Sequence, residues 1–271
     1  MPVNSSRFNR FLVLLLGQYM LATMAFGQAF ELTDADLQWL GERVFANECA
    51  SKYDCLTSWN EGEDFPSLGI GHFIWFQAGQ DSPFEETFPA LLQYFEERNV
   101  ETPGWLNNNA NPESPWRNRE EFYTDFNSER SIQLRTFLDR TKAIQVDFIV
   151  RRLGQSLEQI ITSFSTDQQT SVRELITTVA RSHPPYGAYA LIDYVHFKGT
   201  GLKSSERYQN QGWGLKHVID KMQGSPITLY SFVQAAKQVL GDRVINAPVA
   251  RNEQRWLVGW HNRVASYLPP H

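Results

Sequence analysis

Four of the five carboxylates between residues 48 and 64 are the side chains of this sequence best suited to acid–base chemistry. Glu48 lies at the end of an amphipathic segment, and Glu61, Glu63 and Asp64 lie close together just before an apolar run that contains glycines. Cleavage of a glycosidic bond uses two carboxyl groups: one donates a proton to the leaving oxygen, and the other faces the positive charge that develops on the sugar. The acids on the two sides of this stretch are candidates for those two roles.

Glu48 is the candidate general acid. It follows Phe45 by three residues, on the apolar side of a helix predicted over residues 33–50, and an acid in such a place must be paired, protonated or facing a cleft. Burial there would raise its pKa and keep it protonated near neutral pH, whereas Glu61 in a polar turn would stay ionised. The alternative is that Glu48 caps or salt-bridges within the fold and that the acidic turn is simply solvated.

Cys49 and Cys55 are the only cysteines of the chain. In an exported protein, two cysteines this close predict one disulfide around a very small loop. Such a short loop contributes only about 2 kcal/mol of stability, so its expected role is to fix the chain where the segment carrying Glu48 turns toward the next strand. A pair of free thiols or a redox couple is the alternative.

Two elements must position these residues. The helix over 33–50 has Thr33 as its expected N-cap and apolar residues at helical spacing. Residues 67–75, with the sequence SLGIGHFIW, alternate small and large side chains and predict a strand whose glycines let another backbone or a ligand come close.

This arrangement resembles the N-terminal lobe of phage-type lysozymes, within the lysozyme-like superfamily. The shared features are an acid at the end of the first helix, a second acid six residues before a hydroxyl residue, and the GIGH run at 69–72. The resemblance implies that Glu48 is the general acid and that Glu61 and Ser67 hold the attacking water or stabilise the cation. It also implies that the strand carrying His72 forms the floor of the sugar-binding cleft.

The sequence also departs from the phage-lysozyme pattern. The gap between Glu48 and Ser67 is longer, by about the length of the segment between the cysteines, and the helical part of the chain is larger. The identity of the second carboxylate therefore stays open, with Glu61, Glu63 and Asp64 as the candidates. The larger helical part indicates a distant branch with its own substrate.

Beyond the predicted strand, the chain is mostly helical in character. Residues 83–98 predict a helix that is kinked or restarted at Pro89, and 99–118 predict an exposed loop. Asp167 is the expected cap of one later helix. Further helices are expected over residues 119–140, 142–164, 168–183, 188–197, 215–222, 228–240 and 249–267. The expected fold class is mainly α (α+β): one lysozyme-like helical domain over 28–271, with a small N-terminal β-hairpin lobe at about 59–77 and a helical lobe at about 119–267.

A second stretch, residues 193–214, has the composition of a site lining, because polar donors and aromatic rings are interspersed with glycines. In lysozyme-like folds the helical lobe supplies the opposite wall of the cleft, so the resemblance implies that this stretch binds sugar or peptide moieties across from Glu48. Trp213 could instead simply pack under its own loop. A metal site built from His183, His196, His217 and Glu206 lacks the usual ligand spacing, so neither a metal nor a cofactor is expected. The candidate substrate-binding residues are His72, Tyr194, His196, Glu206, Gln211 and Trp213.

The N-terminus and the net charge indicate where the protein acts. Residues 1–27 have the basic start, apolar centre and small-residue end of a signal peptide, so we expect a periplasmic or secreted protein without a stable membrane span after cleavage. An uncleaved anchor is the alternative. Removing Arg7 and Arg10 leaves 23 basic against 30 acidic residues, a charge near −7, which argues against a nucleic-acid partner. The eight tryptophans and ten tyrosines belong either to the core, the favoured reading, or to sugar-binding platforms.

Together these features predict an exported enzyme that cleaves peptidoglycan or a related amino-sugar polymer, as a hydrolase or a lytic transglycosylase. The alternative is a catalytically inactive lysozyme-like module that binds cell-wall glycan or a protein partner.

Overall fold

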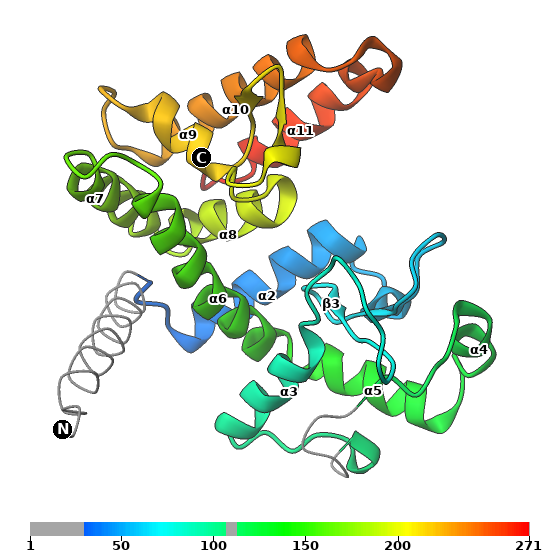
Figure 1. The fold of residues 1–271 in the computed structure, drawn as a ribbon. Helices are drawn as coiled ribbons and strands as arrows, with labels where there is room; N and C mark the ends of the chain where they lie inside the picture. The colour runs from blue at the N-terminus through cyan, green and yellow to red at the C-terminus, as the bar shows by residue number, and fades with distance from the viewer. Residues whose placement is uncertain (1–29, 107–112, 271) are drawn as a thin grey trace, which may run out of the picture. The chain divides into compact units, whose positions relative to one another are not determined.

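The computed structural model of the chain describes residues 30–106 and 113–270 (Figure 1). The fold is mostly helical, with 60% helix, 4% strand and a small antiparallel sheet near the N-terminus, which confirms the predicted fold class. The predicted signal peptide lies outside the described residues.

The described chain forms two compact units, which we call the N-terminal unit and the C-terminal unit. The first comprises residues 33–149, and the second comprises residues 30–32 and 150–270. The boundary falls inside one helix, α6(Lys142–Thr162). Whether the two units act as one domain, as the sequence suggested, stays a prediction.

The N-terminal unit begins with α2(Asp34–Cys49), as predicted. Its first turn is closed by a capping box, in which Thr33 Oγ1 accepts from the Asp36 amide and the Asp36 carboxylate accepts from the Thr33 amide. Leu40, Val44 and other apolar side chains of the helix are buried. Because Thr33 and Asp36 are three residues apart, this start was visible in the sequence.

The small sheet follows α2 as a meander of order β1-β2-β3, formed by β1(Thr57–Ser58), β2(Ser67–Leu68) and β3(Phe73–Ile74). Neighbouring strands are antiparallel, and Ser67 pairs with Ser58 on one side and Ile74 on the other. The prediction of one strand over 67–75 is therefore wrong. A turn divides it, because Gly69 (φ +67°) and His72 (φ +48°) have the left-handed conformation, which lies outside the extended region of regular strands.

The helices of the N-terminal unit cover the sheet and carry two corrections to the predicted boundaries. The helix predicted from residue 83 begins only at Phe88, because Pro89 lies in its first turn, where proline is tolerated. The helix predicted over 119–140 is broken at 125–128, where Ser128 caps the second segment. The elements are η1(Tyr53–Leu56), α3(Phe88–Glu97), η2(Gly104–Leu106), α4(Arg119–Thr124), α5(Glu129–Arg140) and the first part of α6.

Aromatic rings fill the core of the N-terminal unit. Trp59, Trp75 and Trp116 are buried, and the Trp116 ring contacts those of Trp75 and Phe122 in edge-on arrangements at centroid distances of 5.9 and 4.9 Å. These three tryptophans therefore serve the core rather than an open sugar platform.

The C-terminal unit is a helical bundle with one two-stranded hairpin. At the top of Figure 1, α10 packs against α9 and α11.

Residues 215–222 are helical as predicted, whereas α10 runs six residues further than expected and only the second half of 249–267 is α-helical. The cap position predicted for Asp167 falls instead on Gln168, which makes no side-chain cap. The elements are the rest of α6, α7(Gln169–Ala180), α8(Tyr186–Lys198), η3(Ser204–Glu206), β4(Arg207–Tyr208), β5(Gln211–Gly212), α9(Leu215–Met222), α10(Leu229–Asn246), η4(Val249–Arg251), η5(Glu253–Trp256) and α11(Leu257–Ala265).

Within residues 30–106 and 113–270, no helix combines the length and apolarity needed to cross a membrane.

Candidate functional site

Glu48 lies in the last turn of α2, one residue before the buried Cys49. Its side chain is half-buried, while Val44 and Phe45 on the same helix are buried. The helix ends one residue later, at Cys49, where Ala50 takes the left-handed conformation and closes the last turn. The sequence therefore places one acid at the edge of the core, where solvent still reaches it.

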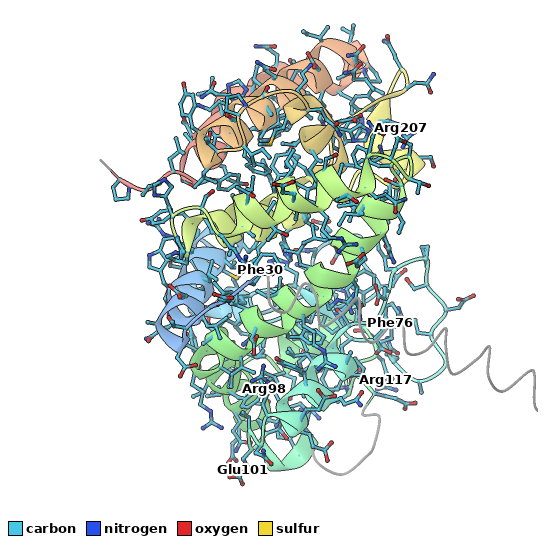
Figure 2. The ribbon with its side chains drawn as sticks, turned by 90° about the vertical axis from the view of Figure 1, so that its left-hand side faces the viewer. Phe30, Phe76, Arg98, Glu101, Arg117 and Arg207 are labelled. Atoms are coloured by element: carbon cyan, nitrogen blue, oxygen red, sulfur yellow. A yellow bond between two sulfur atoms is a disulfide. The ribbon has the colours of Figure 1, made fainter. Side chains whose placement is uncertain are left out.

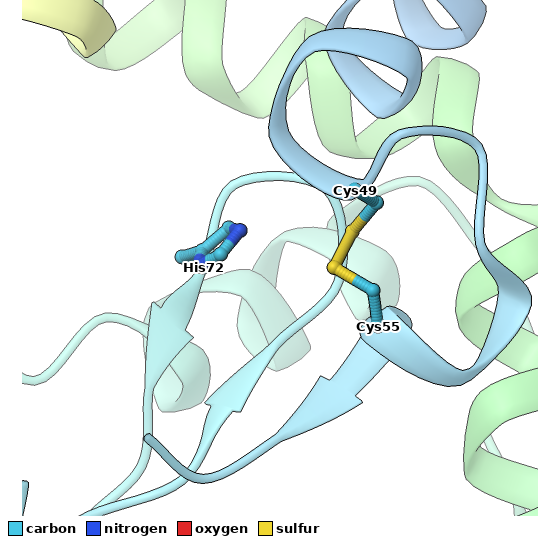
Figure 3. Close-up of side chains that lie close together, drawn as sticks. All are labelled: Cys49, Cys55 and His72. Atoms are coloured by element: carbon cyan, nitrogen blue, oxygen red, sulfur yellow. A yellow bond between two sulfur atoms is a disulfide. The ribbon is translucent and has the colours of Figure 1, made fainter. Parts of the chain in front are cut away.

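Cys49 and Cys55 lie at disulfide distance, with their Cα atoms 5.4 Å apart. The pair joins the end of α2 to η1, which leads into β1. Figure 3 shows the imidazole of His72 beside the two sulfur atoms. The ligand-capable atoms of the three side chains lie within 4.8 Å of one another. The turn before β3 thus packs against the segment that carries Glu48.

The acidic turn between β1 and β2 is anchored at its start by Trp59. Tyr123 and Arg119 hold the backbone of Trp59 through hydrogen bonds of 2.9–3.3 Å. The Trp59 indole in turn donates to the Glu63 carbonyl oxygen at 2.7 Å. A buried tryptophan therefore anchors the start of the loop and binds its backbone again at Glu63.

The three acids of this turn differ in their surroundings. Glu61 is exposed at the tip, and Asp64 is exposed as well, with its carbonyl oxygen bound by Gln80 at 3.0 Å. Glu63 is half-buried and accepts a hydrogen bond from the side-chain amide of Asn60 at 3.1 Å. Glu63 is therefore the acid of the turn whose carboxylate is held in one orientation by a neighbour.

Ser67 and the turn after β2 are largely enclosed by protein. Ser67 is 5% exposed, so little of its surface can meet a ligand. The Ile70 amide donates to Gln145 Oε1 at 2.9 Å, and Gln145 Nε2 donates to the Leu138 carbonyl oxygen at 2.6 Å. A Cβ atom on Gly69 would collide with the Gln145 side chain. The close approach that the glycines predicted is made by this buried amide, which lies 75 residues away in sequence and was not anticipated.

The second predicted group of residues lies in the C-terminal unit, where Tyr194 and Trp213 are buried together. The Tyr194 hydroxyl donates to the Trp213 carbonyl oxygen at 2.9 Å, and complete burial raises the pKa of Tyr194. The Trp213 ring lies against Tyr208 and under the guanidinium of Arg243, 4.0 Å from the ring centre. These contacts are those of a packed loop.

Glu206 holds the same loop closed. Its carboxylate accepts from the Gly201 amide at 2.5 Å, and its carbonyl oxygen accepts from the Trp213 amide at 3.2 Å. Gln211 and His196 are exposed. Because these residues belong to the C-terminal unit and Glu48 to the N-terminal unit, their common site stays a prediction.

Sequence reasoning missed a cluster of charges at the end of α8. Arg243 pairs with Glu253 at 2.7 and 2.8 Å, and Arg263 pairs with Asp193 at 2.9 and 2.8 Å. Lys198 is buried beside them, with its Nζ atom 3.5 Å from the Trp260 ring centre and 3.9 Å from that of Phe197. Burial, reinforced by Arg243, lowers the pKa of Lys198 to about 7. Arg243 and Glu253 are ten residues apart, but Asp193 lies 70 residues from Arg263 and Lys198 lies 45 residues from Arg243, so no local pattern in the sequence indicated the cluster.

A groove of about 600 Å³ opens on another part of the N-terminal unit. Arg98, labelled in Figure 2, contributes to its wall and pairs with Asp147, while Lys142 pairs with Asp139 at 2.5 Å. None of the acids between residues 48 and 64 lines it. Four acidic and three basic residues line it, so its charge is mixed.

Metal-binding capacity among the described residues is confined to one group. Cys49, Cys55 and His72 are the one set of three or more His, Cys, Asp or Glu side chains there that could hold a metal ion. The histidines at 183, 196 and 217 do not join Glu206 in such a set.

No protein-family model, curated protein or solved structure matches the chain. The functional argument therefore rests on the residues and the geometry described above.

Proposed function

We propose that this protein cleaves glycan, with peptidoglycan or a related amino-sugar polymer as substrate and Glu48 as general acid. The observation that carries the proposal is the half-buried Glu48 at the end of α2, followed directly by a small antiparallel meander whose first loop bears three further acids. The lysozyme-like pattern of the sequence supports the same assignment. We also propose export to the periplasm or the medium, on the basis of residues 1–27.

In this proposal, Glu48 donates its proton to the glycosidic oxygen, and one acid of the β1–β2 turn faces the oxocarbenium ion or activates water. The hydrogen bonds from Tyr123 and Arg119 to the Trp59 backbone support this role for the turn. They hold the loop before substrate arrives, so less ordering is needed when the transition state forms.

The test is to incubate the purified protein, lacking residues 1–27, with peptidoglycan and with chitosan-type oligosaccharides, and to analyse the products by mass. New reducing ends support a hydrolase, and anhydro ends support a lytic transglycosylase. Absence of any cleaved product overturns the enzymatic proposal.

A second candidate function is a catalytically inactive module that binds cell-wall glycan or a protein partner. The burial of Ser67 favours it, because a serine residue that is 5% exposed offers substrate little access to its hydroxyl group. Pull-down with insoluble peptidoglycan in the same preparations separates the two candidates, since binding without cleavage is expected only for the inactive module.

A further inference from the structure

We propose that Cys49, Cys55 and His72 form a redox-controlled zinc site: once a dithiol has reduced the cysteine pair, the two thiolates and the imidazole bind one Zn²⁺ ion. All three ligand-capable atoms already lie within 4.8 Å of one another (Figure 3). They come from the end of α2, from η1 and from the turn before β3, so the protein fold, and not one local sequence motif, assembles them.

His72 supplies an independent observation that points to a ligand. Its Nε2 atom is buried, and no described residue makes a hydrogen bond to it. A buried polar atom left in this state costs about 1–3 kcal/mol, so most are paired. The backbone holds His72 in the left-handed conformation (φ +48°) at the end of a turn that Gln145 clamps. The fold thus fixes an imidazole beside two sulfur atoms with a ring nitrogen unused by other described residues.

The chemistry balances when a dithiol is the reductant. The disulfide accepts two electrons and two protons and becomes two thiols, while the dithiol becomes its own disulfide. Zinc binding then releases the two thiol protons, because thiolates are the ligands. Around tetrahedral zinc, with Zn–S bonds of about 2.3 Å, the sulfur atoms would lie roughly 3.8 Å apart. In the disulfide the two sulfur atoms are bonded, so after reduction they must move apart to reach this separation, while all three ligand atoms start within 4.8 Å of one another.

Three protein ligands leave one tetrahedral position for water, and two thiolates with one imidazole suit zinc. The disulfide and the zinc site exclude each other, since both use the same sulfur atoms. The disulfide ties the end of α2 to η1, and the zinc site would tie it to the turn before β3 as well. A change between the disulfide and the zinc site would affect the position of Glu48, because Glu48 is the neighbour of Cys49. An effect on catalysis through Glu48 is the one consequence that rests on the proposed function.

The experiment is a zinc titration of the protein in its oxidised form and after reduction, with the reductant removed under anaerobic conditions and a chromophoric chelator as competitor. We expect one Zn²⁺ per chain in the reduced protein and none in the oxidised protein. His72→Asn should weaken zinc binding at least ~10-fold, because even the loss of an outer-shell partner has an effect of that size. Asparagine also tolerates the left-handed backbone, so the turn is retained.

His183→Asn is the matched control, because His183 is also a histidine with φ +48° but is exposed and belongs to no metal-binding group among the described residues. It should leave the zinc affinity unchanged. Reduced wild-type protein that binds no zinc, or His72→Asn that binds it as tightly as wild type, overturns the proposal. If reduction lowers the melting temperature, zinc must raise it again relative to chelator, and failure to do so counts against the site. None of these readouts uses glycan cleavage.

Discussion

Glu48 is the residue on which the catalytic proposal depends. Glu48→Gln keeps the shape of the side chain and removes the transferable proton, so turnover should fall at least ~100-fold, the range expected for the loss of general acid catalysis. The measurement is the initial rate on whichever glycan the product analysis identifies, with a circular-dichroism melt to show that folding is intact.

The control for Glu48→Gln is Glu96→Gln. Glu96 is an exposed acid in the last turn of another helix of the same unit, α3, and should have no effect on turnover. A Glu48→Gln protein that cleaves at the wild-type rate removes Glu48 from the mechanism.

The second carboxylate can be chosen by comparing three single variants of the β1–β2 turn. The sequence favoured Glu61, but the contacts favour Glu63, which is half-buried and hydrogen-bonded to Asn60. We expect Glu63→Gln to lower turnover at least ~100-fold, as expected for one of two essential carboxyl groups, and Glu61→Gln and Asp64→Asn less than ~10-fold. A larger loss for Glu61→Gln would restore the original assignment.

At the residue scale, local signals were predictable and distant partners were not. The Thr33 cap follows from residues three positions apart, and Glu48 at the end of its helix follows from helical spacing. The anchoring of Trp59 by Arg119 and Tyr123 joins residues about 60 positions apart, and no pattern in the sequence encodes it.

The turn between β2 and β3 is the element whose geometry can be tested most directly. Gly69→Ala places a Cβ atom at φ +67° and against the side chain of Gln145. The left-handed backbone costs about 1–2 kcal/mol, and disturbing the buried hydrogen bond from the Ile70 amide to Gln145 adds about 1–3 kcal/mol. We therefore expect the free energy of unfolding to fall by roughly 2–5 kcal/mol in urea denaturation.

Gly79→Ala provides the matched control, because Gly79 has nearly the same conformation (φ +68°) with no atom within 4 Å of the new Cβ. The free energy of unfolding of Gly79→Ala should fall only by the cost of the left-handed backbone, about 1–2 kcal/mol. Equal losses for the two variants would show that Gln145 does not constrain the turn.

This turn also shows why an element can be misread from sequence. Alternating small and large residues in SLGIGHFIW fit a single strand as well as they fit two short strands. The choice between them depends on Gln145, which comes from α6 and satisfies the Ile70 amide. Helix boundaries are equally hard to predict from the sequence. The helix predicted to begin at residue 83 begins five residues later, at Phe88.

At the scale of the whole chain, the division into two units could not be predicted from the composition of the sequence. The boundary between residues 149 and 150 falls within the continuous helix α6, so no linker rich in glycine, proline or serine marks it. The small β-lobe and the helical remainder were predictable because their hydrophobic periods differ.

The pH dependence of unfolding should report on the buried Lys198. Because its pKa in the folded protein, about 7, lies below the unfolded value, the unfolded state binds more protons between the two values. Stability should therefore be lowest near and below pH 7 and rise as the pH increases toward the unfolded pKa. Between pH 7 and pH 9 the rise should be on the order of 2 kcal/mol.

The comparison of Lys198→Met with wild type in urea denaturation at pH 7, 8 and 9 isolates this effect. The pH window matters, because burial raises the pKa of Tyr194 and Tyr267, whose contribution would lower stability above about pH 10. The variant should be more stable than wild type at pH 7, with a difference that narrows at pH 9. Lys203→Met, at an exposed lysine, should keep the wild-type dependence. Parallel curves for Lys198→Met and wild type would show that Lys198 is stabilised as a cation by the rings of Phe197 and Trp260 and by Glu253 despite its burial.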